Sequence, residues 1–445
     1  MLTSIDYQNA LNDQQLRAVT STQGPHLVIA GAGSGKTRVL VYRTAYLVEQ
    51  GVDPSGILLL TFTRRAANEM LERAAAVLDD RCRRVSGGTF HSFANMILRR
   101  YAQRAGLPEN FTILDEADAG SVISRIRQDK GLQKLDKKFP RKDTILSVIS
   151  KSINKQTDTA VVIDEEYPHF QQWTSAIEEI KKDYTRVKRE MGALDFDDLL
   201  TVLHRLLQTQ EDVRLALGRR YRYLMVDEYQ DTNRIQAQII RLLACEHDNV
   251  MVVGDDSQSI YSFRGAHFKN IIHFPDDFPG TTVIKLEENY RSSQPILNLT
   301  NEIILSAREK FEKILFTRNE GGCRPVYRDV MNENAQSKYI VQKIQELARE
   351  GTGLGEIAVL FRSGWHSNDL EIELSSCGIS FVKYGGHKFL ESAHVKDVVS
   401  YLRLVHNPSD QVSWMRVLTL MRGVGPKTAA AIADEAARSG SAGMV

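Results

Sequence analysis

The sequence has 445 residues, of which 42% are hydrophobic and 25% charged, and its formal net charge is +1. This profile is typical of a soluble globular protein with about two to four domains, and the balanced charge argues neither for nor against a nucleic-acid partner. Four widely spaced cysteines without a zinc-binding spacing, the lack of an apolar run near the roughly 18 residues of a membrane helix, and the lack of a signal-peptide pattern predict a cytoplasmic protein with no membrane partner.

Four short apolar runs have the pattern of strands that are buried on both faces of a parallel sheet. They are Leu27–Ala30, Ile57–Leu60, Tyr223–Val226 and Val250–Val253. Helical patterns follow them, such as the one that ends at Gly51. Small or polar residues stand directly after these runs, at the carboxyl ends of the expected strands, where open α/β sheets bind ligands.

The pattern changes farther along the chain. Helical segments dominate between about residues 106 and 190, and a second series of strands is expected from Val283–Leu286, Ile357–Phe361 and Ser380–Tyr384. We therefore expect an α/β fold with two lobes and helical additions. The expected parts are a first lobe of residues 1–105 and 191–275, a helical insertion of 106–190, a second lobe of 276–385 and a helical segment of 386–445.

The stretch AGAGSGKT follows an expected strand and opens an expected helix. Its glycines let the backbone close around an anion, with N–H groups and the helix N-terminus directed at phosphate. Lys36 would reach the β- and γ-phosphates of a nucleotide, and the Thr37 hydroxyl would bind Mg²⁺. The alternative is a glycine-rich turn that binds nothing, which the flanking strand and helix disfavour. The residues expected around the phosphates are Ala30, Gly31, Ala32, Gly33, Ser34, Gly35, Lys36 and Thr37.

The stretch MVDEYQD, Met225–Asp231, places two acids at the end of a hydrophobic run. Asp227 is placed to hold Mg²⁺ through water, and Glu228 is placed to polarise an attacking water. Two acids at a strand end are alternatively the start of a solvated loop, but the phosphate-binding stretch favours the catalytic interpretation. Together the two motifs predict a nucleoside triphosphatase.

The stretch GDDSQSIYSFRGA joins polar residues to aromatic residues and a cation. Gln258 is expected beside the γ-phosphate, where an amide can both donate and accept. Tyr261 and Phe263 offer sequence-tolerant stacking to bases, and Arg264 can pair with a phosphodiester or lie on a ring. The residues alone leave open whether Tyr261 and Phe263 are ordinary core aromatics. If they stack on bases, a small shift at the phosphate moves the stacking surface.

The motifs and their order from about Leu11 to Thr428 resemble the N-terminal part of UvrD/Rep/PcrA-type superfamily 1 DNA helicases. The motifs are LNDQQ, AGAGSGKTR, TFTRRAANEM, GTFHSF, LDFDDLL, VDEYQD, VGDDSQSIYSFRGA and LEENYRSS. The resemblance implies RecA-like P-loop NTPase lobes with parallel sheets and helical insertions. It also implies an ATP-dependent, Mg²⁺-requiring helicase that moves 3′→5′ on single-stranded DNA in repair or recombination.

On the nucleotide side, the resemblance implies that Gln15 reads the adenine edge, Tyr290 stacks on adenine and Arg291 meets the γ-phosphate. Arg38 closes the phosphate-loop motif and joins the ATP-contacting set. The implied catalytic group is Glu228, Asp227, Gln258 and Arg291, and Gln258 would couple hydrolysis to DNA binding. The implied DNA contacts are Phe62, Thr63, Arg64, His91, Tyr261, Phe263 and Arg264.

The end of the chain departs from the family's pattern. Nothing in Gly385–Val445 resembles motifs V and VI, so we expect an incomplete second lobe and a chain that binds ATP but hydrolyses it slowly. The stretch RGVGPKTAAAIADEA resembles the start of an accessory domain, and its Gly-Val-Gly is either a nest for DNA phosphate or a plain turn. Single-stranded DNA and duplex junctions are the expected partners. The alternative function is a truncated ATP- and DNA-binding fragment without motor activity.

Overall fold

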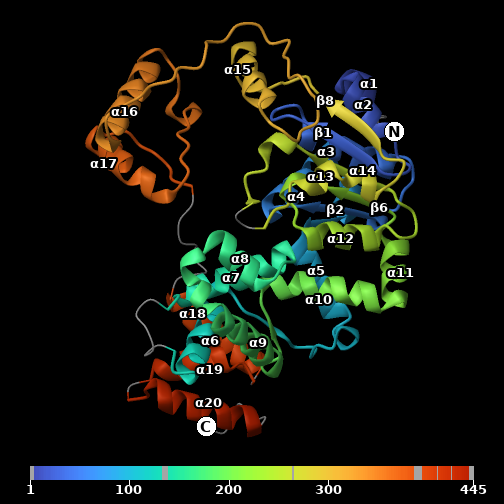
Figure 1. The fold of residues 1–445 in the computed structure, drawn as a ribbon. Helices are drawn as coiled ribbons and strands as arrows, with labels where there is room; N and C mark the ends of the chain where they lie inside the picture. Colours follow the sequence, from blue (N-terminus) through green and yellow to red (C-terminus); the bar gives the residue numbers. More distant parts are fainter. Residues whose placement is uncertain are drawn as a thin grey trace. The chain divides into compact units, whose positions relative to one another are not determined.

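The computed structural model describes residues 5–132, 139–262, 265–384, 393–407, 409–421 and 423–439. The chain forms two compact units, one of Met1–Cys323 with Arg403–Val445 and one of Arg324–Leu402. The larger unit carries the sheet and most of the helices (Figure 1). It also contains the phosphate loop and the two motifs with paired acids, MVDEYQD and GDDSQSIYSFRGA. The positions of these three motifs relative to one another can therefore be described.

The larger unit is built on a six-stranded sheet with the strand order β3-β2-β6-β7-β1-β8. Every neighbouring pair of strands is parallel. The strands are β1 (His26–Ala30), β2 (Ile57–Thr61), β3 (Ser86–Thr89), β6 (Tyr223–Val226), β7 (Val250–Gly254) and β8 (Thr282–Leu286). Because all strands run the same way, the loops after them leave one edge of the sheet and can share one site.

The four strands predicted in the first lobe are confirmed as β1, β2, β6 and β7. The run Val283–Leu286 also forms a strand, but as β8 it pairs with β1 in this same sheet. β3 was not predicted, because its sequence, Ser-Gly-Gly-Thr, contains no apolar run. A Cβ at Gly87 would lie 2.8 Å from Cδ1 of Leu71, so the close packing of a helix explains glycine in this strand.

Helices cover both faces of the sheet and bury its strands in two apolar clusters. Alternate residues of β1 divide between the clusters: Leu27 and Ile29 join one, and Val28 and Ala30 join the other. This two-sided burial explains why β1, β2, β6 and β7 are continuous apolar runs. Facing the first cluster are α5 (Phe90–Arg100), α10 (Phe196–Thr209), α11 (Glu211–Arg220), α12 (Arg234–Leu243), α13 (Lys269–Ile272) and α14 (Phe274–Asp277); facing the second are α1 (Tyr7–Ala10), α2 (Asp13–Thr20), α3 (Lys36–Glu49) and α4 (Arg64–Val77).

A helical part with an apolar core of its own lies between β4 (Thr112–Ile113) and β5 (Ala193–Leu194), which pair in parallel. Its helices are α6 (Glu116–Asp129), α7 (Lys142–Lys155), α8 (Thr159–Glu166) and α9 (Thr174–Glu190). The buried ammonium of Lys188 on α9 lies 2.5 Å from Oδ2 of Asp195 and 2.6 Å from Oδ2 of Asp198. This ion pair ties the helical part to the first turn of α10, which begins in the LDFDDLL motif.

The chain after β8 is mostly helical. Its helices are α15 (Gln294–Leu305), α16 (Glu333–Arg349), α17 (Asn368–Ser376), α18 (Ala393–His406), α19 (Gln411–Thr419) and α20 (Pro426–Ser439). In the smaller unit, α16 and α17 pack through a small apolar cluster that includes Val341 and Leu370. Among the described residues, no helix is both long and apolar enough to cross a bilayer. All four cysteines lie at described positions and are free thiols.

The prediction of strands at Ile357–Phe361 and Ser380–Tyr384 is wrong, because the structure assigns neither run to a strand. The side chains of Leu360 and Val382 are 93% and 77% exposed. A strand is stabilised by hydrogen bonds to a neighbouring strand, and the described residues provide none for these two runs. Apolar residue type alone was therefore an insufficient criterion.

Candidate nucleotide and nucleic-acid site

The phosphate loop connects β1 to α3. Gly33 and Gly35 have φ angles of 76° and 90°, a region that residues with a Cβ rarely adopt. Neighbouring side chains also require glycine: a Cβ at Gly33 would lie 2.7 Å from Cβ of Arg291, and one at Gly35 would lie 2.6 Å from Nε2 of Gln15. The loop therefore has the tight turn that directs backbone N–H groups at an anion.

Gln15 contacts the phosphate loop from the N-terminal side. It is 1% exposed, and its Nε2 donates to the Ser34 carbonyl over 3.1 Å. A capping box with Asn12 orients it, since the Gln15 N–H donates to Oδ1 of Asn12 and the Asn12 N–H donates to Oε1 of Gln15. The buried Ser34 hydroxyl donates to the Gly31 carbonyl over 2.8 Å. The Gln15 amide thus binds the loop and keeps one N–H hydrogen for a base.

Lys36 and Thr37 open α3 at the end of the loop. The Lys36 ammonium lies 3.4 Å from Oε2 of Glu228, and the Lys36 side chain is 11% exposed. The cation expected at the phosphates is therefore paired with the acid expected to act on water. Arg38 points away from this pair, and its Nη2 donates to the Ala10 carbonyl over 2.6 Å.

Asp227 and Glu228, which follow the carboxyl end of β6, differ in environment. Burial raises the pKa of Asp227 to about 7, with a further contribution from the charge of Glu228 and an opposing one from Lys36. Glu228 has φ 50° and ψ 47°, a left-handed conformation that is costly for a residue with a Cβ. Such strain is concentrated at functional sites, where surrounding contacts hold it in place.

Two carboxylate oxygens at this edge have no hydrogen-bond partner among the described residues. They are Oδ1 of Asp227 and Oδ1 of Asp231, and both atoms are buried. Unpaired buried oxygens are costly, and hard oxygen donors suit Mg²⁺. Together with the Thr37 hydroxyl they fit a Mg²⁺ ion that is shared with nucleotide phosphates. No three His, Cys, Asp or Glu side chains of the described chain form a ready-made metal cluster.

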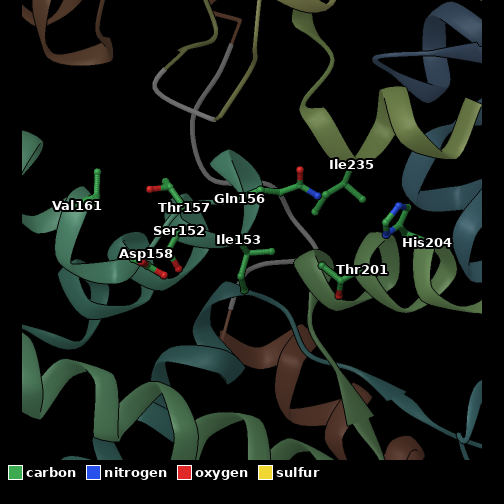
Figure 2. Close-up of a pocket in the computed structure, with 9 residues that line it drawn as sticks. All are labelled: Ser152, Ile153, Gln156, Thr157, Asp158, Val161, Thr201, His204 and Ile235. Carbon is green, nitrogen blue, oxygen red and sulfur yellow. The ribbon is translucent and has the colours of Figure 1, made fainter. Parts of the chain in front are cut away.

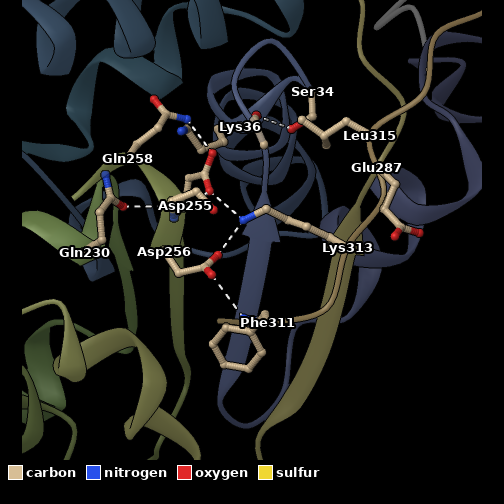
Figure 3. A network of polar contacts seen from close by, with 12 residues as sticks. Ser34, Lys36, Gln230, Asp255, Asp256, Gln258, Glu287, Phe311, Lys313 and Leu315 are labelled. Carbon is tan, nitrogen blue, oxygen red and sulfur yellow. Dashed lines mark hydrogen bonds and ion pairs between the residues drawn. The ribbon is translucent and has the colours of Figure 1, made fainter. Parts of the chain in front are cut away.

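Gln230 links the ends of β6 and β7 and was not singled out from the sequence. It is 1% exposed, its Oε1 accepts the Asp255 N–H over 3.0 Å, and its Nε2 donates to Oε2 of Glu228 over 2.8 Å. Gln258 donates to Oδ2 of Asp255 over 2.6 Å (Figure 3). A chain of hydrogen bonds therefore connects Glu228 to Gln258. The position of Gln230 two residues after Glu228, within the VDEYQD motif, was the only sequence signal for this link.

The segment after β8 contacts the phosphate loop directly. The Tyr290 N–H donates to the Gly33 carbonyl over 2.9 Å, and the Asn289 amide donates to the Ala32 carbonyl. The Tyr290 ring is half exposed, and its hydroxyl accepts from Nδ2 of Asn12 over 2.8 Å. The Arg291 N–H donates to Oδ1 of Asn289 over 2.8 Å. Buried Asn289, which the sequence reasoning missed, therefore holds Tyr290 and Arg291 at the loop.

Two of the residues expected to bind DNA form a pair at the same edge of the sheet. The rings of Phe62 and Tyr261 stack with a centroid separation of 5.0 Å and an interplanar angle of 28°. Phe62 is 43% exposed and Tyr261 is half-buried, so neither ring belongs to the core. Exposed Thr63 caps α4 by accepting the Ala66 N–H, and exposed Arg64 begins that helix.

His91 lies on α5, where its ring meets the edge of Phe196 at a centroid distance of 5.9 Å. Burial lowers the pKa of His91. Phe196 is 51% exposed and was not among the predicted DNA contacts. Its place in the LDFDDLL motif was the only sequence signal that it lies near His91. Phe263 and Arg264 lie outside the described residues, so their expected DNA contacts stay predictions.

An open pocket of about 520 Å³ lies between the helical part and the sheet's helices (Figure 2). Ser152, Gln156 and Asp158 line it from the helical part, and Thr201 and His204 line it from α10. None of the expected ATP or DNA contacts lines this pocket. It is therefore separate from the phosphate loop and from the aromatic pair.

Comparison with known proteins shows two family matches. Residues 11–279 match the model of the UvrD/REP helicase N-terminal domain, and residues 284–441 match that of the UvrD-like helicase C-terminal domain. The ATP-dependent DNA helicase PcrA of Staphylococcus aureus (strain COL) is 38% identical over 423 residues, which cover 94% of this chain and 57% of that protein. PcrA of Staphylococcus epidermidis (strain ATCC 12228 / FDA PCI 1200) is 38% identical over 421 residues, with the same coverage.

The second match corrects one expectation. The sequence was expected to lack the C-terminal part of the family, but residues 284–441 match the C-terminal domain model. The lack of a resemblance to motifs V and VI was the wrong criterion, because a domain's likeness is also spread over the apolar pattern of its helices. The chain spans 57% of the length of these curated relatives.

Proposed function

Because the chain belongs to the UvrD/REP helicase family, we propose that it acts as an ATP-dependent DNA helicase that moves along single-stranded DNA. The arrangement of the sheet edge carries this proposal. The phosphate loop after β1, the acids after β6, Gln258 after β7 and the Phe62–Tyr261 pair all leave the same edge. A nucleotide site and a base-stacking surface are thereby joined through the ends of neighbouring strands.

The chemistry follows from the contacts at the loop. The phosphates of ATP would take Lys36 from its ion pair with Glu228, and this would free the Glu228 carboxylate to accept a proton from the attacking water. Arg291 would approach the γ-phosphate, and Tyr290 would stack on the adenine. Mg²⁺, held by Thr37 and Asp227, would supply neutralisation of phosphate charge.

Coupling to DNA would run through the amides at the sheet edge. Gln258 would respond to the γ-phosphate, and its hydrogen bond to Asp255 leads through Gln230 to Glu228. Tyr261 follows Gln258 by three residues and stacks on Phe62. A shift at the phosphate would therefore move the ring pair on which DNA bases stack.

The organisation of the chain is part of this proposal. Residues 1–105 and 191–275 would form the first RecA-like lobe together with β8, and 106–190 would form an accessory DNA-binding insertion. The part of 276–385 that follows β8 would belong to the second lobe, and 386–445 would begin a further helical domain. Duplex junctions, 3′→5′ movement, a cytoplasmic location and a role in repair or recombination are proposed from the family resemblance. The four free thiols are compatible with that location.

A steady-state ATPase assay with and without single-stranded DNA tests the proposed function. The parent chain should hydrolyse ATP with Mg²⁺ and respond to DNA, and Lys36→Ala should abolish nucleotide binding or hydrolysis because the phosphates lose their counter-charge. Lys343→Ala is a matched control, since exposed Lys343 pairs with Glu346 on α16 and belongs to neither the ATP nor the DNA contacts. Normal hydrolysis by Lys36→Ala would show that the loop does not serve ATP.

A further inference from the structure

The segment 310–317 lies along the edge that carries the phosphate loop. The Leu315 side chain fills the space above Gly31, where a Cβ would lie 2.5 Å from Cδ2 of Leu315. The Asn289 N–H donates to the Phe316 carbonyl over 2.7 Å, and the Phe316 N–H donates to the Glu287 carbonyl over 3.1 Å. Backbone hydrogen bonds thus hold this segment beside the loop.

Lys313 projects from this segment into a buried group of acids. Its ammonium lies 2.5 Å from Oδ1 of Asp255 and also pairs with Asp256 (Figure 3). The side chains of Lys313 and Asp255 are both 4% exposed, and that of Asp256 is 1% exposed. Burial raises the pKa of Asp255, but the charge and hydrogen bond of Lys313, the hydrogen bond from Gln258 and the charge of Lys36 together outweigh burial, so the pKa lies below its ordinary value. Asp255 is therefore held as a carboxylate.

The two oxygens of Asp255 have different partners. Oδ1 binds Lys313, and Oδ2 accepts from the Gln258 amide over 2.6 Å. The Asp255 N–H donates to Gln230 over 3.0 Å. Without Lys313, two buried carboxylates would stand close together without the cation that pairs with both, which is unfavourable unless one of them takes a proton or moves. Either response would release Gln258 from its present orientation.

We propose that Lys313 is a positioning residue for ATP hydrolysis: by holding Asp255, it orients Gln258. This inference rests on the proposed function, because Gln258 is assigned there to the γ-phosphate. Among the described residues, the ion pairs of the Lys313 ammonium are with Asp255 and Asp256 and not with the phosphate loop, so Lys313 acts on the rate of turnover and not on nucleotide affinity. Lys313 also joins the segment after α15 to the end of β7, because it pairs with Asp256. Asp256 in turn accepts the Phe311 N–H over 3.0 Å.

The test compares Lys313→Met with Lys310→Met in the full chain. The Lys310 ammonium donates only to the carbonyl oxygens of Ile304 and Leu305 in the described structure. It is therefore a control lysine from the same segment that makes no contact with Asp255 or Asp256. Lys313→Met should lower kcat for DNA-stimulated hydrolysis by about tenfold to a hundredfold, the usual effect of a displaced catalytic group, and leave KM for ATP within about twofold. Lys310→Met should retain the parent's values.

A double variant separates positioning from loss of folding. The double variant Lys313→Met with Asp256→Asn removes one of the two unpaired charges and should recover part of the lost kcat. If Lys313→Met instead causes a general packing defect, the second substitution should lower kcat further. Equal kcat in Lys313→Met and the parent, or equal losses in kcat and ATP affinity, would overturn the proposal. A parent chain that hydrolyses no ATP would instead overturn the proposed function, and with it the role of Lys313.

Discussion

The rings of Phe62 and Tyr261 stack 5.0 Å apart, although they follow β2 and β7, which are separated by β6 in the sheet. The pair therefore spans the end of the strand that carries Asp227 and Glu228. No local sequence pattern would bring these two rings together, because the contact depends on the order of the strands. Their position places a base-stacking surface beside the acids of the nucleotide site.

Removal of either ring should weaken binding of single-stranded DNA. Phe62→Ala and Tyr261→Ala are each expected to cost about 1–3 kcal/mol, the usual value of one stacked base. Since the rings touch, the double variant should cost less than the two single losses together. Fluorescence anisotropy with a labelled oligonucleotide measures these affinities. Tyr223→Ala, at the opposite end of β6, is the control, and equal binding by all variants would show that the ring pair is structural.

Asp227 and Glu228 should differ in the step that each supports. Asp227→Asn should weaken Mg²⁺-dependent nucleotide binding, because a metal ligand loses its charge. Glu228→Gln should retain binding and slow hydrolysis, because an amide cannot accept the proton of water. Binding of a fluorescent nucleotide, measured with and without Mg²⁺, and single-turnover hydrolysis distinguish the two effects. The same loss of affinity in both variants would contradict this division.

Asp227→Asn should also stabilise the nucleotide-free protein at pH 8. Folding raises the pKa of Asp227 from 3.8 to about 7, so the folded state binds the proton more tightly than the unfolded chain does. The parent therefore loses stability as the pH rises from about 4 to about 7, and the variant lacks this loss. The difference corresponds to at most about 4 kcal/mol above pH 7.

Urea unfolding of the parent and Asp227→Asn at pH 5 and pH 8 measures this effect. The stability gain of the variant should be larger at pH 8 than at pH 5. Asp329→Asn, at an exposed position, serves as the control for the replacement of an acid by an amide. A gain that is the same at both pH values would mean that the charge of Asp227 does not cause it.

Gln230→Ala should uncouple the ends of β6 and β7. The variant leaves the Asp255 N–H and the Glu228 carboxylate without this partner, which should cost about 1–3 kcal/mol of folding stability. Basal ATP hydrolysis should fall less than its stimulation by DNA, because the link to Gln258 is broken. Gln238→Ala on α12 removes an exposed amide and is the matched control. Full DNA stimulation in Gln230→Ala would exclude this route of coupling.

Local features of the sequence were sufficient for β1, β2, β6, β7 and β8 and for the phosphate loop, but not for β3. Leu27–Ala30 is apolar because both faces of β1 are covered, and Gly33 and Gly35 are required by left-handed backbone angles. These demands act on consecutive residues, so they leave a readable pattern. Asp227 and Glu228 were singled out in the same way, because they directly follow the apolar run that forms β6.

Contacts between distant segments were decided only by the tertiary structure. The sequence does not show that β8 pairs with β1, that Gln230 accepts the Asp255 N–H, or that Lys313 enters the acids after β7. Each contact depends on which strands are neighbours and which loops leave the same edge. That order is set by burial of the whole sheet between its helices, because the same apolar run satisfies more than one strand order.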